Sequence, residues 1–227
     1  MTDWDALYRT ANGCRWWPNE ELVRASAARV ARRGPLQRAL EVGCGNGANL
    51  WLLAERAARV TGLDVSVEAI ERAEAYMRQR RFFREGVCRN PVDADVTFDR
   101  GTLEMIHYAD ASFDAVVDVM TSQHVTWADH AALYGEYRRV LQPGGWLFIY
   151  HLDSLTRTRR DDWRGDYDYG VIGLFSEIRE FCLPPPESLE RAVIDAGFEL
   201  GGRSGFAREY ENGDVAHYTV IDAEVPS

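Results

Sequence analysis

The 227-residue sequence contains no lysine and only four cysteines, and it lacks any long apolar run. Its 26 basic residues are all arginine, which we interpret as a coding bias. The cysteines are isolated and form no CxxC pair, so we expect reduced thiols in a cytoplasmic protein. No apolar run approaches the roughly 20 residues of a membrane helix, and the N-terminus does not have the pattern of a signal peptide.

The charge balance is acidic, with a formal net charge of -10 and a pI of about 5.0. Such a surface repels a polyphosphate backbone, so we expect no nucleic-acid partner. No basic amphipathic helix favours a membrane partner. With 46% hydrophobic residues the chain is long enough to bury one sizeable core. We therefore expect a single domain.

Short apolar runs alternate with helical periodicity, which indicates βαβ units and a parallel sheet. One predicted helix carries Leu50, Leu53, Ala54 and Ala57 on a single face. The other predicted helices cover 19–33, 67–81 and 127–141, and the strands cover 38–42, 59–63, 95–100, 113–119 and 146–151. The stretch 82–94 is predicted to be irregular.

The C-terminal part follows a different pattern. Pro186 begins a helix that Gly197 ends, and an Asn-Gly turn then joins two strands at 198–208 and 215–224 into an antiparallel hairpin. We divide the chain into a helical cap, a core, a lid insertion and a closing helix with its hairpin. These parts cover 1–35, 36–152, 153–185 and 186–227.

The most informative segment lies between the first strand and the helix that follows it, at Gly43, Gly45 and Gly47. Without Cβ atoms the chain turns tightly there, and a ligand lies against its backbone. Asp64 follows the second strand, where a carboxylate accepts hydrogen bonds from both hydroxyls of a ribose. Together these residues indicate a nucleoside cofactor; the alternative for Asp64 is a helix-capping acid.

Two cofactors fit this pattern. Gly43, Gly45 and Ala48 match the GxGxxA dinucleotide fingerprint, which favours an NAD-linked oxidoreductase. S-adenosylmethionine fits better, because the acidic Glu41 before the turn suits a sulfonium or ammonium and Gly47 completes a GxGxG. Nothing after residue 150 resembles a second substrate domain.

Four segments resemble the motif series of class I S-adenosylmethionine-dependent methyltransferases of the small-molecule type. They are Glu41-Val-Gly-Cys-Gly-Asn-Gly47, Asp64, Ser112-Phe113-Asp114 and Arg139-Val-Leu-Gln-Pro-Gly-Gly145, in order over roughly residues 38–151. The resemblance implies an α/β fold with three layers: a Rossmann-like, seven-stranded, mostly parallel sheet with an antiparallel last strand, and an N-terminal helical cap. A non-catalytic S-adenosylmethionine-binding protein is a further alternative.

The resemblance also implies which residues hold S-adenosylmethionine. Gly43, Cys44, Gly45 and Gly47 border the methionine moiety, and Glu41 anchors the loop or the amino group. Asp64 holds the ribose, and Val65 lies against adenine. Thr102 stands where the family often has an Asp that binds the adenine amino group. The remaining expected contacts come from the cap, the third loop and the fourth strand: Tyr8, Trp16, Leu103, Asp118 and Val119.

Two histidines follow strands at the edge where a substrate would bind, His124 after the fourth and His151 after the fifth. Either is a candidate base toward an acceptor hydroxyl or amine, or else a structural residue. The histidine spacing has no HExxH pattern, so we expect no metal. These residues predict methyl transfer to an O or N atom of a soluble small molecule, by a monomer or homodimer.

Overall fold

A computed structural model gives the structure and describes all residues except 1–2, 11–14, 88–93, 104–105, 158–180 and 212. The described residues form a seven-stranded sheet in the order β3-β2-β1-β4-β5-β7-β6. Its strands are β1 (Leu36–Val42), β2 (Ala57–Asp64), β3 (Asp95–Arg100), β4 (Phe113–Val119), β5 (Leu141–Leu152), β6 (Glu199–Glu209) and β7 (Val215–Glu224). Strand β7 is antiparallel to both β5 and β6, which confirms the predicted hairpin and sheet.

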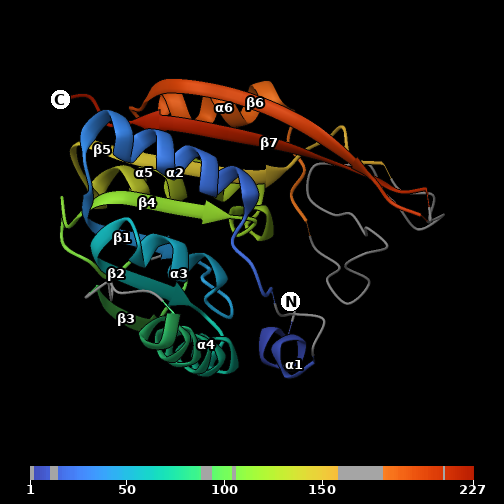
Figure 1. Ribbon diagram of the computed structural model, residues 1–227. Coiled ribbons are helices and arrows are strands. Elements are labelled where there is room, and N and C mark those ends of the chain that lie inside the picture. Colours follow the sequence, from blue (N-terminus) through green and yellow to red (C-terminus); the bar gives the residue numbers. More distant parts are fainter. Residues whose placement is uncertain (1–2, 11–14, 88–93, 104–105, 158–180, 212) are drawn as a thin grey trace.

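Helices cover both faces of the sheet (Figure 1). They are α1 (Trp4–Arg9), α2 (Glu20–Arg33), α3 (Ala48–Ala54), α4 (Val67–Val87), α5 (His130–Val140) and α6 (Pro186–Asp195), with short 3-10 turns η2 (Ser122–His124) and η3 (Trp127–Asp129). Leu22 of α2 and Leu50 of α3 belong to one buried cluster, and Leu133 of α5 and Leu189 of α6 belong to the other. The result is the predicted three-layer arrangement.

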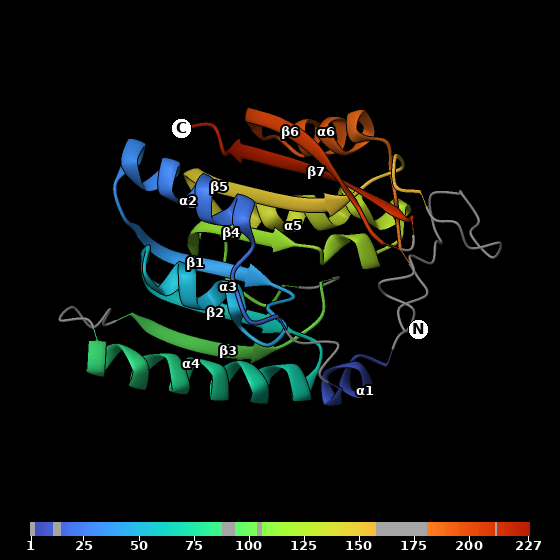
Figure 2. The same ribbon diagram turned by 45° about the vertical axis from the view of Figure 1, so that its right-hand side comes forward.

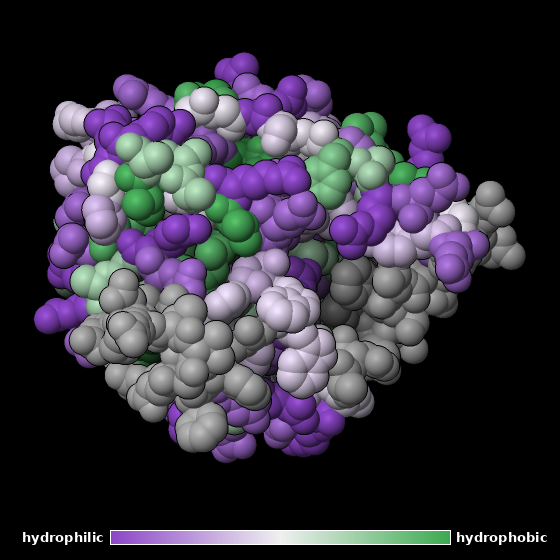
Figure 3. Space-filling model, in the orientation of Figure 1, coloured by the Kyte–Doolittle hydropathy of each residue, from purple (hydrophilic) through white to green (hydrophobic). Residues whose placement is uncertain are grey.

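The helices turn their polar sides outward. The face in Figure 3 is mostly hydrophilic, with small apolar patches between charged side chains. Within the described residues, no helix combines the length and the apolar composition that a bilayer crossing requires. The sequence pattern located these helices because their apolar residues repeat at helical spacing.

Several predicted boundaries were wrong. Helix α4 continues to Val87, although 82–94 was predicted to be irregular, because no proline interrupts this run of helix-forming residues before Pro91. Ala57 begins β2 instead of extending α3, which ends at Ala54. The helix predicted to begin at 127 begins at His130, after the turn η3.

Strand β5 is longer than predicted, and Pro143-Gly144-Gly145 lies inside it. Leu141 pairs with Phe113, and pairing resumes only at Trp146 opposite Ala115. The intervening residues form an irregularity in the pairing. It accommodates a proline and two glycines without ending the strand. Of the predicted lid insertion at 153–185, residues 158–180 lie outside the described part of the chain.

Candidate functional site

A cavity of about 2010 Å³ lies at the carboxyl ends of β1, β2 and β4 and extends to the β6–β7 hairpin. We call it the main cavity. In an open parallel sheet this edge is where ligands bind, because the strand order reverses there between β1 and β4. Figure 1 shows the hairpin reaching beyond the ends of β1 and β4. The predicted site residues on the lining are Tyr8, Glu41, Gly43, Cys44, Gly45, Asp64, Val65, Thr102, Leu103, Val119 and His124.

The glycine turn is held by two close neighbours. Gly43 and Gly45 have φ angles of +61° and +53°, a region that side-chain-bearing residues rarely adopt. A Cβ on Gly43 would lie 2.2 Å from the side chain of Thr121, and one on Gly45 would lie 2.6 Å from the Tyr8 hydroxyl. Both positions therefore require glycine, and their backbone forms the cavity floor.

Glu41 has one carboxylate oxygen that nothing in the described chain satisfies. Oε1 accepts a hydrogen bond from the Asn49 side-chain amide over 2.8 Å, whereas Oε2 is buried without a hydrogen-bond partner. Burial raises the pKa of Glu41 to about 8. A buried carboxyl oxygen that lines the cavity is a binding position for a cationic ligand group, because a cation would supply the missing partner.

Asp64 connects the glycine turn to the start of α4. Its Oδ2 accepts from the Gly45 amide over 2.8 Å, and its Oδ1 accepts from the Ser66 amide over 2.9 Å. Burial raises the pKa of Asp64, and these hydrogen bonds oppose the shift. A carboxylate oxygen has the capacity to accept two hydrogen bonds, so the Asp64 carboxylate retains acceptor sites for a ligand in the cavity.

The N-terminal segment covers the same edge of the sheet. Asp5 of α1 accepts a hydrogen bond from the Ser66 hydroxyl over 2.6 Å, which places α1 beside the start of α4 (Figure 2). Arg15 is tied to Asn46 through its backbone, with its amide donating over 3.0 Å and its carbonyl accepting over 2.6 Å. The Arg15 side chain reaches Met120 and faces the cavity.

Sequence reasoning placed Arg15 in the N-terminal cap and Asn46 in the glycine motif without assigning them contacts, and it missed Asn49 and Thr121 as parts of the site. Their contacts join residues about 30 to 105 positions apart, and no local pattern indicates such pairs. The only available signal was the position of Asn46 and Asn49 beside the glycines. Asn49 also accepts a hydrogen bond from the Asn19 amide over 2.8 Å, which fixes the start of α2 at the cavity.

Three predicted cofactor residues do not line the main cavity. Gly47 packs toward Ala73 of α4, and the Trp16 side chain is 61% exposed while its carbonyl accepts from the Tyr76 hydroxyl. Asp118 is completely buried and accepts hydrogen bonds from the Thr121 amide and the Tyr137 hydroxyl. It holds the turn that carries Thr121, so any effect on a ligand is indirect.

The two predicted base candidates occupy different environments. His124 lines the cavity, between the rings of Trp4 and Phe181 at centroid distances of 4.8 and 5.0 Å. The Gln123 side-chain amide lies 3.3 Å from His124 Nε2, and its own oxygen accepts from the Leu152 amide. An amide nitrogen only donates, so Nε2 of His124 carries the lone pair.

His151 is fully buried and lies off the cavity lining. Its Nδ1 donates to the Leu152 carbonyl, and burial together with His130 lowers the pKa of His151 to about 3. Its imidazole is therefore neutral at physiological pH and shielded from a ligand in the cavity. The geometry favours His124 over His151 as the proton acceptor.

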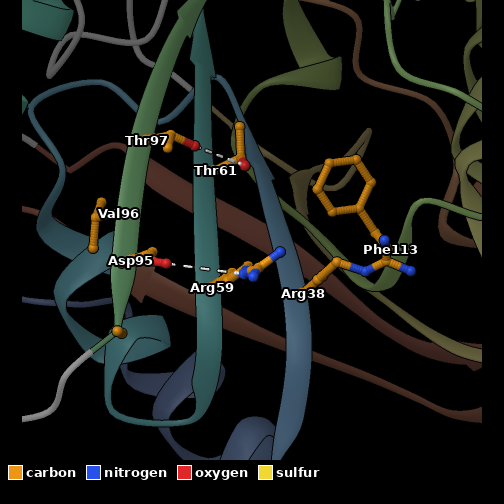
Figure 4. Close-up of a pocket in the computed structure, with 8 residues that line it drawn as sticks. Arg38, Arg59, Thr61, Asp95, Val96, Thr97 and Phe113 are labelled. Carbon is orange, nitrogen blue, oxygen red and sulfur yellow. Dashed lines mark hydrogen bonds and ion pairs between the residues drawn. The ribbon is translucent and has the colours of Figure 1, made fainter.

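A smaller cavity of about 660 Å³ lies at the other end of β1, β2 and β3 (Figure 4). Arg59 and Asp95 approach to 3.9 Å there, and the hydroxyls of Thr61 and Thr97 lie 3.0 Å apart. None of the predicted site residues lines it. Its place at the amino ends of the strands is not where open parallel sheets bind ligands.

Comparisons with known proteins agree with this geometry. A family model described as a methyltransferase domain matches residues 40–149. A sterol 24-C-methyltransferase of Gibberella zeae is 31% identical over 202 residues, which are 84% of this chain and 47% of that protein. A ubiquinone biosynthesis O-methyltransferase of Methylococcus capsulatus is 26% identical over 208 residues, which are 84% of this chain and 79% of that protein.

Solved structures show the same fold. The N-methyltransferase NodS of Bradyrhizobium japonicum, in complex with S-adenosyl-L-homocysteine, superposes with a TM-score of 0.68 at 15% identity and covers 99% of this chain and 97% of its own. The chain spans 27% to 56% of the length of three further curated relatives.

Proposed function

The chain belongs to the class I S-adenosylmethionine-dependent methyltransferases, and we propose that it methylates an oxygen or nitrogen atom of a small-molecule acceptor. One observation carries the proposal: the glycine turn, Glu41 with its buried unpartnered oxygen, and Asp64 all line one cavity. The ubiquinone biosynthesis O-methyltransferase supports an oxygen acceptor, and the sterol 24-C-methyltransferase, named for a carbon acceptor, supports only methyl transfer to a small molecule.

The residues present fit S-adenosylmethionine. Glu41 Oε2 would take the ammonium, and the Arg15 guanidinium, whose charge acts on Glu41, would take the carboxylate. Asp64 would hold the ribose hydroxyls. Val65, Thr102 and Leu103 line the cavity beyond Asp64 and would border the adenine. The bare backbone of Gly43 and Gly45 leaves room for the methionine chain.

Bound S-adenosylmethionine supplies a methyl group already activated by its sulfonium. The protein therefore has to align the acceptor and exclude water, as α1 and the segment around Arg15 would do by covering the cavity. The acceptor atom would supply the electron pair of the new bond to the methyl carbon, and the pair of the broken bond would stay on sulfur. For a hydroxyl acceptor, the His124 imidazole would take the released proton.

Two alternatives fit the site less well. A dinucleotide places a pyrophosphate on the glycine turn, where the buried Glu41 carboxyl supplies no positive charge to bind it. A non-catalytic binding protein would not require a candidate base in the cavity, and His124 lines it.

The test is a turnover assay with S-adenosylmethionine and fractionated metabolite extracts. We expect release of S-adenosylhomocysteine together with a one-methyl gain in mass of one metabolite. If NAD(H) binds and S-adenosylmethionine does not, the oxidoreductase alternative replaces the proposal. If S-adenosylmethionine binds and no extract yields a methylated product, the non-catalytic alternative replaces the proposal.

A further inference from the structure

Three aromatic side chains from neighbouring strands form a wall on the hairpin side of the main cavity. They are Tyr150 of β5, Tyr218 of β7 and Phe206 of β6, and all three line the cavity. The Tyr150 and Tyr218 rings lie 4.8 Å apart with 30° between their planes, and the Phe206 and Tyr218 rings lie 5.3 Å apart with 28°. The Tyr150 and Phe206 rings are 5.9 Å apart with 48° between their planes, so the three tilted rings form one contiguous aromatic cluster at the cavity.

The sheet register produces this wall. Phe206 is directly opposite Tyr218 in the β6–β7 pair, and Tyr150 lies diagonally from Tyr218 in the β5–β7 pair. Cross-strand neighbours at these positions are close enough for ring contact. Antiparallel pairing of the last strands therefore sets the wall beside the site that the parallel strands form.

Phe206 is the accessible member of the wall, because Tyr150 and Tyr218 are buried in the core cluster against which it packs. Phe206 is half-buried on the edge strand β6, while its flanking residues Ser204, Gly205 and Ala207 are exposed and also line the cavity. Their small side chains leave the face of the wall accessible. The hydroxyls of Tyr210 and Tyr218, 3.3 Å apart, add a polar rim.

The wall and the candidate base share the cavity. The Met120 amide donates to the Tyr150 carbonyl over 2.8 Å, which holds the end of β4 beside β5, and η2 with His124 follows directly. An acceptor lying on the wall would have one edge toward this end of β4. Aromatic rings prefer parallel-offset or edge contacts with other rings, which a saturated ring does not gain.

We propose that the methyl acceptor is a planar aromatic compound whose ring lies on the wall of Tyr150, Phe206 and Tyr218 and whose hydroxyl or amine points toward His124. This inference rests on the proposed function. It names a class of acceptor for the same site, and Phe206 becomes a specificity-determining residue, since it is the most exposed ring of the three.

Binding to the protein loaded with S-adenosylhomocysteine tests the inference without turnover. Calorimetry compares a naphthol with its fully saturated decalin alcohol, which has the same carbon skeleton and hydroxyl. We expect the naphthol to bind about two- to tenfold more tightly. Phe206→Leu should abolish the preference, and Phe206→Tyr should retain it.

Phe98→Leu is the matched control, because Phe98 is also a half-buried phenylalanine on an edge strand but lies outside the main cavity. Equal binding of the two alcohols, no binding of either, or a preference that survives Phe206→Leu would overturn the inference. If Phe206→Leu fails to fold, the comparison in the unmodified protein still decides. Failure of S-adenosylhomocysteine itself to bind would instead contradict the proposed function, and the inference with it.

Discussion

The Asp64 carboxylate accepts a hydrogen bond from the Gly45 backbone amide over 2.8 Å, and this bond joins the end of β2 to the glycine turn after β1. The residue predicted to bind the ribose therefore also shapes the turn beneath the methionine moiety. Its second oxygen accepts from the Ser66 amide at the start of α4. The ribose and helix-capping interpretations of Asp64 are thus compatible, since one carboxylate has acceptor sites for both.

Replacing Asp64 should weaken cofactor binding strongly. Asp64→Ala removes charge-assisted acceptors for the ribose and loosens the turn, so we expect affinity for S-adenosylmethionine to fall by about ten- to a hundredfold. Calorimetric titration measures this, with Asp95→Ala on exposed β3 as the control. Unchanged affinity in Asp64→Ala would remove the ribose assignment.

Glu41→Gln should stabilise the fold and weaken binding at once. Because burial raises the pKa of Glu41 to about 8 in the folded chain from an ordinary value of 4.5, the folded state holds a proton that the unfolded state releases. The contribution of this proton to the free energy of unfolding is fully present below pH 4.5. It falls between pH 4.5 and about 8, by up to about 1.4 kcal/mol per pH unit.

The glutamine keeps the hydrogen bond with Asn49 but does not ionise. The melting temperature of the variant should therefore rise relative to that of the unmodified protein between pH 5 and 8. Its affinity for S-adenosylmethionine should fall, because the ammonium loses an anionic partner. A stability difference that does not change with pH would show that Glu41 titrates normally.

His124 and His151 should separate in a mutational test. His124→Gln should lower kcat on a hydroxyl acceptor by about a hundredfold or more, with little change in cofactor affinity. His151→Leu should change the melting temperature and leave kcat within a fewfold, because that imidazole is buried off the cavity. The reverse result would return the base role to His151.

Gly45→Ala should destabilise the turn for two separable reasons. The alanine would be strained at a φ of +53°, and its Cβ would meet the Tyr8 hydroxyl at 2.6 Å. Gly197→Ala is the control, with a φ of +91° after the end of α6 and Arg138 Nε, at 3.8 Å, as the nearest atom to the added Cβ. We expect about 1 kcal/mol of backbone strain in both variants and a further loss only at Gly45.

Tyr8→Phe should partly rescue Gly45→Ala and should have no effect on Gly197→Ala. Urea unfolding of the single and double variants gives the coupling free energy between Tyr8 and Gly45. A coupling of zero would mean that α1 does not cover the glycine turn in solution.

The sequence predicted the parts of the fold whose signals are local. Strand β4, the hairpin and the end of α6 at Gly197 follow from apolar runs and turn residues that act within a few positions. The irregularity that keeps Pro143 inside β5 depends on its pairing with β4, and no local pattern contains it. The true extent of β5 was therefore missed.

The site residues also differ in whether a local sequence signal identifies them. Glu41, the glycines and Asp64 were recognisable because their spacing along the chain carries the signal. Arg15 and the aromatic wall depend on which segments fold against each other, since Tyr150 and Phe206 are 56 positions apart and meet only through β7. His151 was a candidate because it ends a strand, but its burial is set by α5 and is not visible in sequence.

A crystal structure with S-adenosylhomocysteine tests the central claim most directly. We predict the ligand at the carboxyl ends of β1 and β2, with its ammonium within hydrogen-bond distance of Glu41 Oε2 and its ribose hydroxyls on Asp64. A ligand bound elsewhere, or one in this cavity that touches neither carboxylate, would contradict the account.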